Sequence, residues 1–316
     1  MAPCGAHGQS VGTRHTQSIN KGEDVAFITF KAADRVSYGI LRQDGVFDLG
    51  VRIGAVLPDL KTFLTAEGLG LVQAIPKVNT TDYGFGQFTY LPVIPNPGKI
   101  LCVGLNYEEH RVETGRAATQ NPAIFTRFAD TLTGHNMPIV LPPNSTALDY
   151  EGELAVVIGR SGFRVKEEEA LGLVSGFAIF NDATLRDWQR HTPQFTPGKN
   201  FPRTGAFGPS LLTREEAGAL EEKRIETRLN GTVMQEAKLG DMIFSISRII
   251  AYLTAFTRLS PGDVIATGTP GGVGFKREPQ VFMKDGDRVE VTIDGLGTLV
   301  NTIEQEPEPD SNHVGN

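Results

Sequence analysis

Two glutamates stand two residues apart in an otherwise apolar stretch, "LDYEGELAVVIG" (148–159). The stretch is typical of a strand, and residues i and i+2 of a strand point to the same face, so Glu151 and Glu153 project together. Paired carboxylates on a partly buried strand repel each other unless they share a proton, contact basic groups or bind a hard cation. The alternative is an exposed strand end whose carboxylates contact water.

A third carboxylate, Asp182, stands where the apolar stretch 174–182 gives way to a predicted helix over 183–191. Such a residue can simply cap the helix N-terminus. Three carboxylates at strand ends instead match the oxygen ligands of an octahedral Mg²⁺ that keeps water or substrate at its open positions. Mn²⁺ and Ca²⁺ also prefer such oxygens. From the residues alone, both interpretations stay open.

His110 and Glu113 stand three residues apart in "NYEEHRVETG" (106–115), which has the pattern of a helix. Residues i and i+3 share a helix face. A carboxylate beside an imidazole fixes the tautomer and raises its basicity, which makes a pair that can activate water or move a proton. A surface ion pair on a loop would show the same spacing.

Basic and amide side chains follow Asp182 in "TLRDWQRHTPQFTPGKNF" (184–201). Arg186 and Gln189 are i and i+3 on the predicted helix, and Lys199 follows in a Gly-Lys turn. Cations beside a metal site can hold a substrate carboxylate. Arg186 can equally serve only to neutralise the acidic cluster.

The Gly-rich stretch "LSPGDVIATGTPGGVGF" (259–275) contains Thr267 and Thr269. No G-K-[ST] follows its glycines and no helix pattern opens after it, so it is neither a Walker A loop nor a dinucleotide fingerprint. It indicates a tight strand-to-loop turn whose threonines and backbone N–H groups face a site.

The composition excludes several other classes of protein. The 316 residues carry a net charge of -7, which disfavours nucleic-acid and anionic-membrane partners. No apolar run reaches the roughly 18 residues of a membrane span. The two cysteines, Cys4 and Cys102, form no disulfide framework, so we expect a reduced, cytoplasmic protein.

The elements that must position these residues form two units. Residues 25–92 predict a small N-terminal domain with a hairpin at Asp44-Gly45, and 99–305 predict a larger catalytic domain with a hairpin at Asn230-Gly231. Residues 245–256 have helical spacing of apolar side chains. Hairpins outnumber βαβ signals, so we expect a β-rich α+β fold. The polar ends, 1–24 and 306–316, are predicted to be disordered.

Together the motifs resemble the fumarylacetoacetate hydrolase family over roughly residues 99–303. They are "CVGLNYEEH", "DYEGELAVVIG", "NDATLRDWQ", "GKNF…GP", "DMIFSISRIIAYLT" and "LSPGDVIATGTPGGVG", in family order. The resemblance implies a mixed β-roll core behind a smaller N-terminal α/β domain, usually in a homodimer. It implies Mg²⁺ or Mn²⁺, with Ca²⁺ as an in vitro alternative, on Glu151, Glu153 and Asp182.

The resemblance also implies roles for the other site residues. His110 and Glu113 correspond to a water-activating dyad on a lid, and Lys199 is expected to take part in catalysis. The expected substrate-binding residues are Arg186, Gln189, Thr269 and Arg203.

The implied reaction is hydrolysis of a C–C bond in a 2,4-dioxo acid, an acylpyruvate or fumarylpyruvate, to pyruvate and a carboxylic acid. The alternative is an isomerase or decarboxylase that acts on hydroxymuconate-like diacids or oxaloacetate through an enolate stabilised by the metal. A lyase for a ureido or sugar-derived 2-oxo acid is a further option, because one such site supports several reactions. A non-catalytic metal-binding scaffold or sensor would predict a broken triad or dyad, and neither is broken.

Two positions depart from the family pattern. Arg127 in "IFTRF" stands where the family often has lysine, and Pro202 in "KNFP" replaces an acidic residue. Arg203 follows directly, and we expect it to contact a second substrate carboxylate. These departures bear on substrate choice rather than on the metal site.

Overall fold

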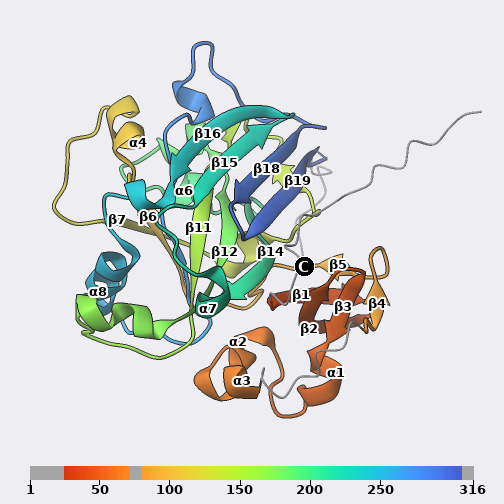
Figure 1. The fold of residues 1–316 in the computed structure, drawn as a ribbon. Coiled ribbons are helices and arrows are strands. Elements are labelled where there is room, and N and C mark those ends of the chain that lie inside the picture. Colours follow the sequence, from red (N-terminus) through yellow and green to blue (C-terminus); the bar gives the residue numbers. More distant parts are fainter. Residues whose placement is uncertain (1–24, 72–79, 308–316) are drawn as a thin grey trace, which may run out of the picture.

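The computed structural model describes residues 25–71 and 80–307 (Figure 1). The segments expected to be disordered, 1–24 and 306–316, lie outside the described residues, apart from 306–307, which are in neither helix nor strand. Among the described residues, no helix is long and apolar enough to cross a membrane.

The N-terminal elements form an antiparallel sheet with short helices beside it. They are β1 (Ala26–Ala32), β2 (Arg35–Arg42), β3 (Gly45–Asp48), α1 (Leu49–Ile53), α2 (Leu60–Phe63), α3 (Ala66–Gly70), β4 (Tyr83–Gly84) and β5 (Thr89–Tyr90). The hairpin predicted at Asp44-Gly45 joins β2 to β3. α2 and α3 are two short helices in succession, and each has its own side-chain N-cap, Asp59 for α2 and Thr65 for α3.

The remaining chain is rich in strands. The strands are β6 (Ile100–Gly104), β7 (Ala123–Arg127), β8 (Leu132–Thr133), β9 (Ile139–Leu141), β10 (Leu148–Asp149), β11 (Gly152–Ile158), β12 (Val174–Asp182), β13 (Thr184–Leu185), β14 (Gly205–Thr213), β15 (Arg224–Leu229), β16 (Thr232–Lys238), β17 (Val264–Ala266), β18 (Arg288–Ile293) and β19 (Gly297–Gln305). The helices are α4 (Glu108–Glu113), α5 (Arg186–Gln189), α6 (Thr196–Lys199), α7 (Arg214–Ala217), α8 (Ile246–Phe256) and short 3-10 helices at Ala129–Thr131, Glu167–Leu173, Leu239–Asp241 and Gly274–Lys276. The helices predicted at 106–115 and 245–256 and the hairpin at Asn230-Gly231 are confirmed.

One large sheet carries the site. In the described part of the chain twelve strands form this sheet. Ten of them follow the order β4-β3-β2-β1-β14-β12-β11-β17-β6-β7, while β5 pairs with β1 and β8 pairs with β14. The N-terminal strands belong to this sheet because β1 pairs with β14. The division into domains at residues 92–99 stays a prediction, but the two units share backbone hydrogen bonds.

A second sheet, in the order β16-β15-β18-β19-β9, packs on the large one. β15 contacts β11, β18 contacts β11 and β12, and β19 contacts β12 and β14 (Figure 1). Large antiparallel-rich sheets with few helices confirm the predicted β-rich α+β fold.

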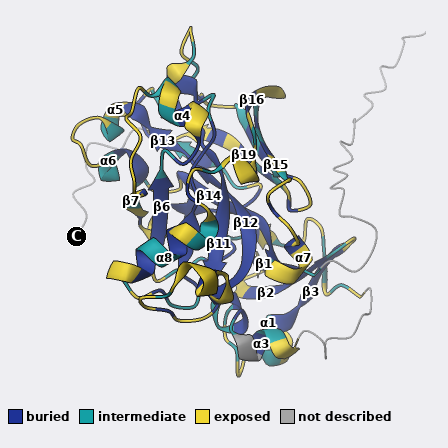
Figure 2. Ribbon diagram, turned by 60° about the vertical axis from the view of Figure 1, so that its left-hand side comes forward, coloured by how far each residue is buried: buried dark blue, intermediate teal, exposed yellow. Residues whose placement is uncertain are grey.

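The two faces of β11 enter two separate cores. Leu154, Val156 and Ile158 belong to the core that includes the apolar residues of the second sheet, whereas Ala155 and Val157 belong to the other core. Gly152 lies so close to the second sheet that a Cβ there would stand 2.2 Å from Thr227 Oγ1. β11 and β12 are buried throughout (Figure 2). The alternation predicted from the sequence is therefore confirmed.

Two predicted elements around the site differ from the structure. The strand predicted over 148–159 is broken at residues 150–151, because β10 pairs with β13 while β11 pairs with β12. The helix predicted over 183–191 is only α5, because Thr184 and Leu185 form β13. Strand pairing with a distant segment overrides the local helical pattern here.

Candidate active site

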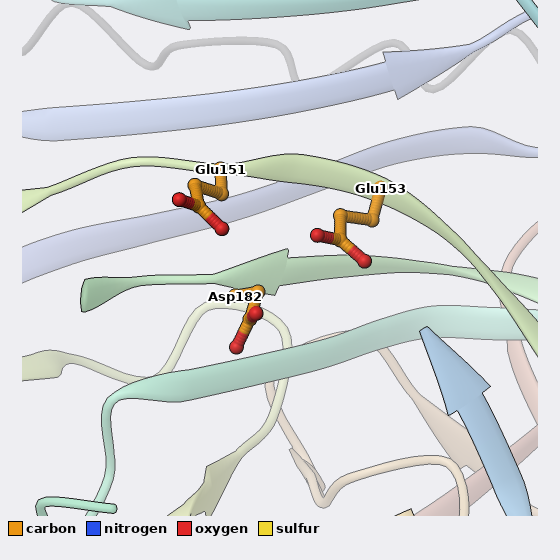
Figure 3. A group of neighbouring side chains, drawn as sticks. All are labelled: Glu151, Glu153 and Asp182. Carbon is orange, nitrogen blue, oxygen red and sulfur yellow. The ribbon is translucent and has the colours of Figure 1, made fainter. Parts of the chain in front are cut away.

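Three buried carboxylates meet at the edge where β11 begins and β12 ends. Glu153 lies in β11 and Glu151 directly precedes this strand. Both side chains project to the side where Asp182 lies (Figure 3). One oxygen from each lies within 4.8 Å of the others. The backbone fixes this arrangement, because the N–H of Asp182 donates to the carbonyl of Glu151 at 2.9 Å.

Three buried cations surround two of these carboxylates. Lys199 Nζ lies 2.6 Å from both Glu151 Oε2 and Asp182 Oδ2. Arg127 Nε donates to Asp182 Oδ1 at 2.5 Å. Arg186 Nη1 lies 2.7 Å from Glu151 Oε1. Arg127 is the last residue of β7, and it stands where the family often has lysine. It therefore keeps a positive charge beside Asp182.

Glu153 differs from its two neighbours. Among the described residues its side chain accepts one hydrogen bond, from the backbone N–H of Gly268 to Oε2 at 2.9 Å. Gly268 has φ +101°, and a Cβ there would stand 2.6 Å from Asn106 Cβ, so only glycine presents this N–H without strain. Burial, together with the charges of Asp182 and Glu151, raises the pKa of Glu153 well above its usual value.

The pKa values of Glu151 and Lys199 shift in the opposite sense from what burial alone would cause. Burial would raise the pKa of Glu151, but Lys199 and Arg186 lower it. Burial would lower the pKa of Lys199, but the carboxylates of Asp182 and Glu151 raise it. Glu151 is therefore held as a carboxylate and Lys199 as an ammonium, while Glu153 is the carboxyl left without a cation.

The donor set fits a hard divalent cation. All three candidate ligands offer carboxylate oxygens, which Mg²⁺, Mn²⁺ and Ca²⁺ prefer. A cation beside Glu153 would supply the positive charge that its surroundings lack, and would allow it to ionise. We therefore identify Glu151, Glu153 and Asp182 as the residues that would hold a metal.

The histidine–glutamate pair forms as the spacing predicted. His110 Nδ1 lies 2.7 Å from Glu113 Oε1, and Glu113 Oε2 accepts the N–H of Gly272 at 3.0 Å. Because an ionised carboxylate only accepts, Nδ1 of His110 carries the proton and its Nε2 is left as an acceptor in the neutral ring. The pair joins α4 to the Gly-rich loop.

A cavity of about 120 Å³ brings most of the predicted site residues together. The predicted residues in its wall are His110, Glu151, Glu153, Arg186, Gln189, Lys199 and Thr269. Glu113 and Asp182 lie behind this wall, bonded to His110 and Lys199. Arg203 is exposed and does not line the cavity, so the structure does not bring it to the other site residues.

Arg186 lines this cavity and has one unused hydrogen-bond donor. Its Nε donates to Asp149 Oδ2 at 2.8 Å, and its Nη1 donates to Gln189 Oε1 at 3.0 Å. Its buried Nη2 has no hydrogen-bond partner among the described residues. A buried donor without a partner is costly, so this atom is suited to binding an anionic ligand.

Two residues that support the site were not identified from the sequence. Asp149 holds Arg186 and also accepts the N–H groups of Gly274 and Phe275. Gln235 donates to Thr269 Oγ1 at 2.7 Å and accepts the N–H of Gly152 at 3.0 Å. Asp149 had a signal, an acidic residue two positions before Glu151, whereas Gln235 lies in a hairpin strand with no motif.

The sequence also matches known proteins. The family model described as "Fumarylacetoacetate (FAA) hydrolase C-terminal" matches residues 99–304. Oxaloacetate tautomerase YisK of Bacillus subtilis is 44% identical over 225 residues, 70% of this chain and 75% of that protein. The mitochondrial oxaloacetate tautomerase FAHD2A of Bos taurus is 39% identical over 264 residues, 82% of this chain and 84% of that protein.

Solved structures with a similar fold include enzymes that are named for different reactions. A 2-hydroxyhepta-2,4-diene-1,7-dioate isomerase from Mycobacterium marinum superposes with a TM-score of 0.70 at 27% identity, covering 90% of this chain and 100% of that chain. A maleylpyruvate hydrolase from Sphingobium superposes with a TM-score of 0.74 at 25% identity, covering 89% and 100%. The resemblance found in the motifs is confirmed, and this chain belongs to the fumarylacetoacetate hydrolase family.

Proposed function

We propose that the protein is a divalent-metal-dependent tautomerase that converts the enol form of a 2-oxo dicarboxylic acid of the oxaloacetate type into its keto form. The observation that carries the proposal is a proton acceptor, His110 Nε2, in the wall of the same cavity as the buried carboxylates Glu151 and Glu153. Tautomerisation needs one proton acceptor and a site that stabilises negative charge on oxygen, and it consumes no second reactant.

The relatives support tautomerisation over the hydrolysis expected first. Proteins at 39% and 44% identity are named as oxaloacetate tautomerases. This activity falls within the alternative that the sequence allowed, an isomerase acting on oxaloacetate. Hydrolases and isomerases share the fold, so the fold itself does not decide between them.

Different residues of the cavity would bind different parts of the substrate. The unused Nη2 of Arg186 would bind the carboxylate next to the 2-oxo group, with Gln189 fixing the guanidinium. Thr269, held by Gln235, lies in the same wall. Glu151, Glu153 and Asp182 would hold a divalent cation, Mg²⁺ or Mn²⁺ by preference, which would stabilise negative charge on the substrate oxygens.

The proton transfer is assigned to the dyad. His110 Nε2 takes the proton from the enol hydroxyl, and the C2–O double bond forms as the C2–C3 double bond becomes a single bond. The electron pair released to C3 then takes the proton back from the imidazolium. Glu113 stabilises the imidazolium through Nδ1 and keeps the ring oriented. Lys199 brings an ammonium to the wall of the cavity, where negative charge would develop on the substrate oxygen. The substrate gains and loses no atom overall, because the proton taken from oxygen is returned to carbon.

Hydrolysis of an acylpyruvate is the second candidate. The same dyad could take a proton from water instead of from the substrate, and a maleylpyruvate hydrolase shares the fold. The two candidates differ in product: tautomerisation keeps the carbon skeleton, whereas hydrolysis yields pyruvate and a carboxylic acid.

A product analysis separates these reactions. Purified protein with Mg²⁺ is given oxaloacetate, an acylpyruvate and fumarylpyruvate, and the products are followed by proton NMR. We expect faster enol–keto exchange of oxaloacetate with no new carbon fragments. Pyruvate with a carboxylic acid from the acylpyruvate would favour the hydrolase, and pyruvate with carbon dioxide from oxaloacetate would favour a decarboxylase.

We also propose a homodimer in the cytoplasm. The dimer rests on the family resemblance, and light scattering should give twice the chain mass of 34.2 kDa. The relative from Bos taurus is named mitochondrial, so fluorescence imaging of the tagged full chain in its own cells should test the location.

A further inference from the structure

The outer wall of the cavity carries positive charge that the protein does not neutralise. Three exposed cations line it: Arg116, Arg190 and Lys276. The deeper cations Lys199 and Arg186 are paired with carboxylates. Among the described residues, no ion pair or hydrogen bond is made by the three outer side chains. They are therefore free to bind an anionic group that enters the cavity.

Phe275 brings two of these cations next to the inner arginine. Its buried ring has the guanidinium carbon of Arg186 at 4.4 Å and that of Arg190 at 4.6 Å from the centroid. Lys276 Nζ lies 5.4 Å from the same centroid. The separation between the guanidinium carbons of Arg186 and Arg190 therefore cannot exceed the sum of their two distances to the ring centroid. Stacking on the ring also restricts long side chains that would otherwise lose more entropy on binding.

The chain arranges the two arginines in sequence as well as in space. Arg190 directly follows α5 and stands four residues after Arg186, which places both on one side of that turn. Asp149 fixes this unit, because it holds Arg186 and accepts the backbone N–H of Phe275. Arg186, Arg190 and Lys276 are therefore gathered around one ring in the wall of the cavity.

We propose that Arg190 and Lys276 form a subsite for the second carboxylate of a dicarboxylic 2-oxo acid, so that the pocket prefers diacids to monoacids with the same 2-oxo end. The inference rests on the proposed function only in placing the 2-oxo end at Arg186 and the metal site. It assigns to Arg190 and Lys276 the role that the sequence suggested for Arg203, which lies outside the cavity. Arg190 and Lys276 set specificity and take no part in proton transfer.

The test compares two ligands that differ in one group. 2-Oxoglutarate and 2-oxopentanoate have the same five-carbon chain and the same 2-oxo acid end, and only the first has a second carboxylate. Isothermal titration of the Mg²⁺-loaded full chain gives both dissociation constants without turnover. We expect wild type to prefer the diacid by at least about tenfold, and the double variant Arg190→Gln/Lys276→Gln to lose that preference while its affinity for 2-oxopentanoate stays unchanged.

Matched controls separate a subsite from net charge. Arg258→Gln removes an exposed arginine that also stacks on a phenylalanine, Phe163, and Lys284→Gln removes an exposed lysine; neither side chain lines the cavity. This control double variant should keep the full diacid preference. Equal loss in both double variants, or equal loss for both ligands, would overturn the proposal.

The outcomes distinguish the subsite from the reaction. A diacid preference that the Arg190/Lys276 variant loses, in a protein that does not tautomerise oxaloacetate, supports the subsite and removes the proposed reaction. Tautomerisation with no diacid preference in wild type overturns the subsite and leaves the reaction. Failure of wild type to bind either ligand also overturns the subsite.

Discussion

Asp149→Asn tests whether the buried carboxylate behind Arg186 holds the site together. Asp149 is fully buried, and both of its oxygens are used. Oδ1 accepts the N–H groups of Tyr150 at 2.9 Å and Gly274 at 2.8 Å. Oδ2 accepts Arg186 Nε at 2.8 Å and the N–H of Phe275 at 3.1 Å.

The cost of the change follows from these four contacts. Asparagine has nearly the same shape, but one of its two terminal atoms becomes an NH₂ group that faces two donors whichever way the amide is turned. Two buried donors lose their acceptor, and Arg186 loses one of its two carboxylate partners. Leaving buried donors unpaired and breaking a buried ion pair should together destabilise the protein by about 3–5 kcal/mol.

The assay uses the single tryptophan, Trp188, in α5 two residues after Arg186. Its fluorescence follows urea unfolding of the full chain, and thermal unfolding should show a decrease in Tm of roughly 10 °C. The KM for oxaloacetate should rise, because Arg186 is no longer fixed. The control Asp34→Asn, on an exposed turn residue, should change stability by no more than about 0.5 kcal/mol. A loss below about 1 kcal/mol with unchanged KM would refute the reasoning.

Three further predictions concern the metal and the dyad. In Glu153→Gln, Mg²⁺ should no longer raise Tm, whereas at 100 times its Kd it should stabilise wild type by about 2.7 kcal/mol; equal shifts would contradict the ligand assignment. Because the pKa of Glu153 is raised well above its usual value and a metal binds its ionised form, the affinity for Mg²⁺ should increase as pH rises, with release of protons on binding. Calorimetry in buffers of different ionisation enthalpy measures this release, and a pH-independent affinity would oppose the assignment. His110→Ala should lower kcat by at least about 100-fold with Mg²⁺ affinity nearly unchanged, and collapse of metal binding would make His110 a structural residue or ligand.

The local sequence predicted which face of β11 carries Glu153, because the periodicity of side chains is set by strand geometry. The alternation along 151–158 places Glu153 above Ala155 and Val157, as the structure has it. The spacing of His110 and Glu113 likewise predicted a contact that forms at 2.7 Å. Both predictions depend only on residues a few positions apart.

The contacts that complete the site depend on distant segments and were not predictable from spacing. Arg127 reaches Asp182 across 55 residues, and Gln235 reaches Thr269 across 34. The helix expected directly after Asp182 is delayed by β13, which exists only because β10 pairs with it. The pairing of β1 with β14, which joins the N-terminal strands to the catalytic sheet, has no local signal either.

The central claim is tested most directly by the decay of enol-oxaloacetate absorbance in a stopped-flow spectrometer. Wild type is measured after chelation, after restoration of Mg²⁺, and beside Glu153→Gln under the same conditions. We predict a rate far above the spontaneous one only for wild type with Mg²⁺, with oxaloacetate recovered intact. A rate equal to the spontaneous one in every sample, or a rate in chelated wild type equal to that with Mg²⁺, would contradict a metal-dependent tautomerase.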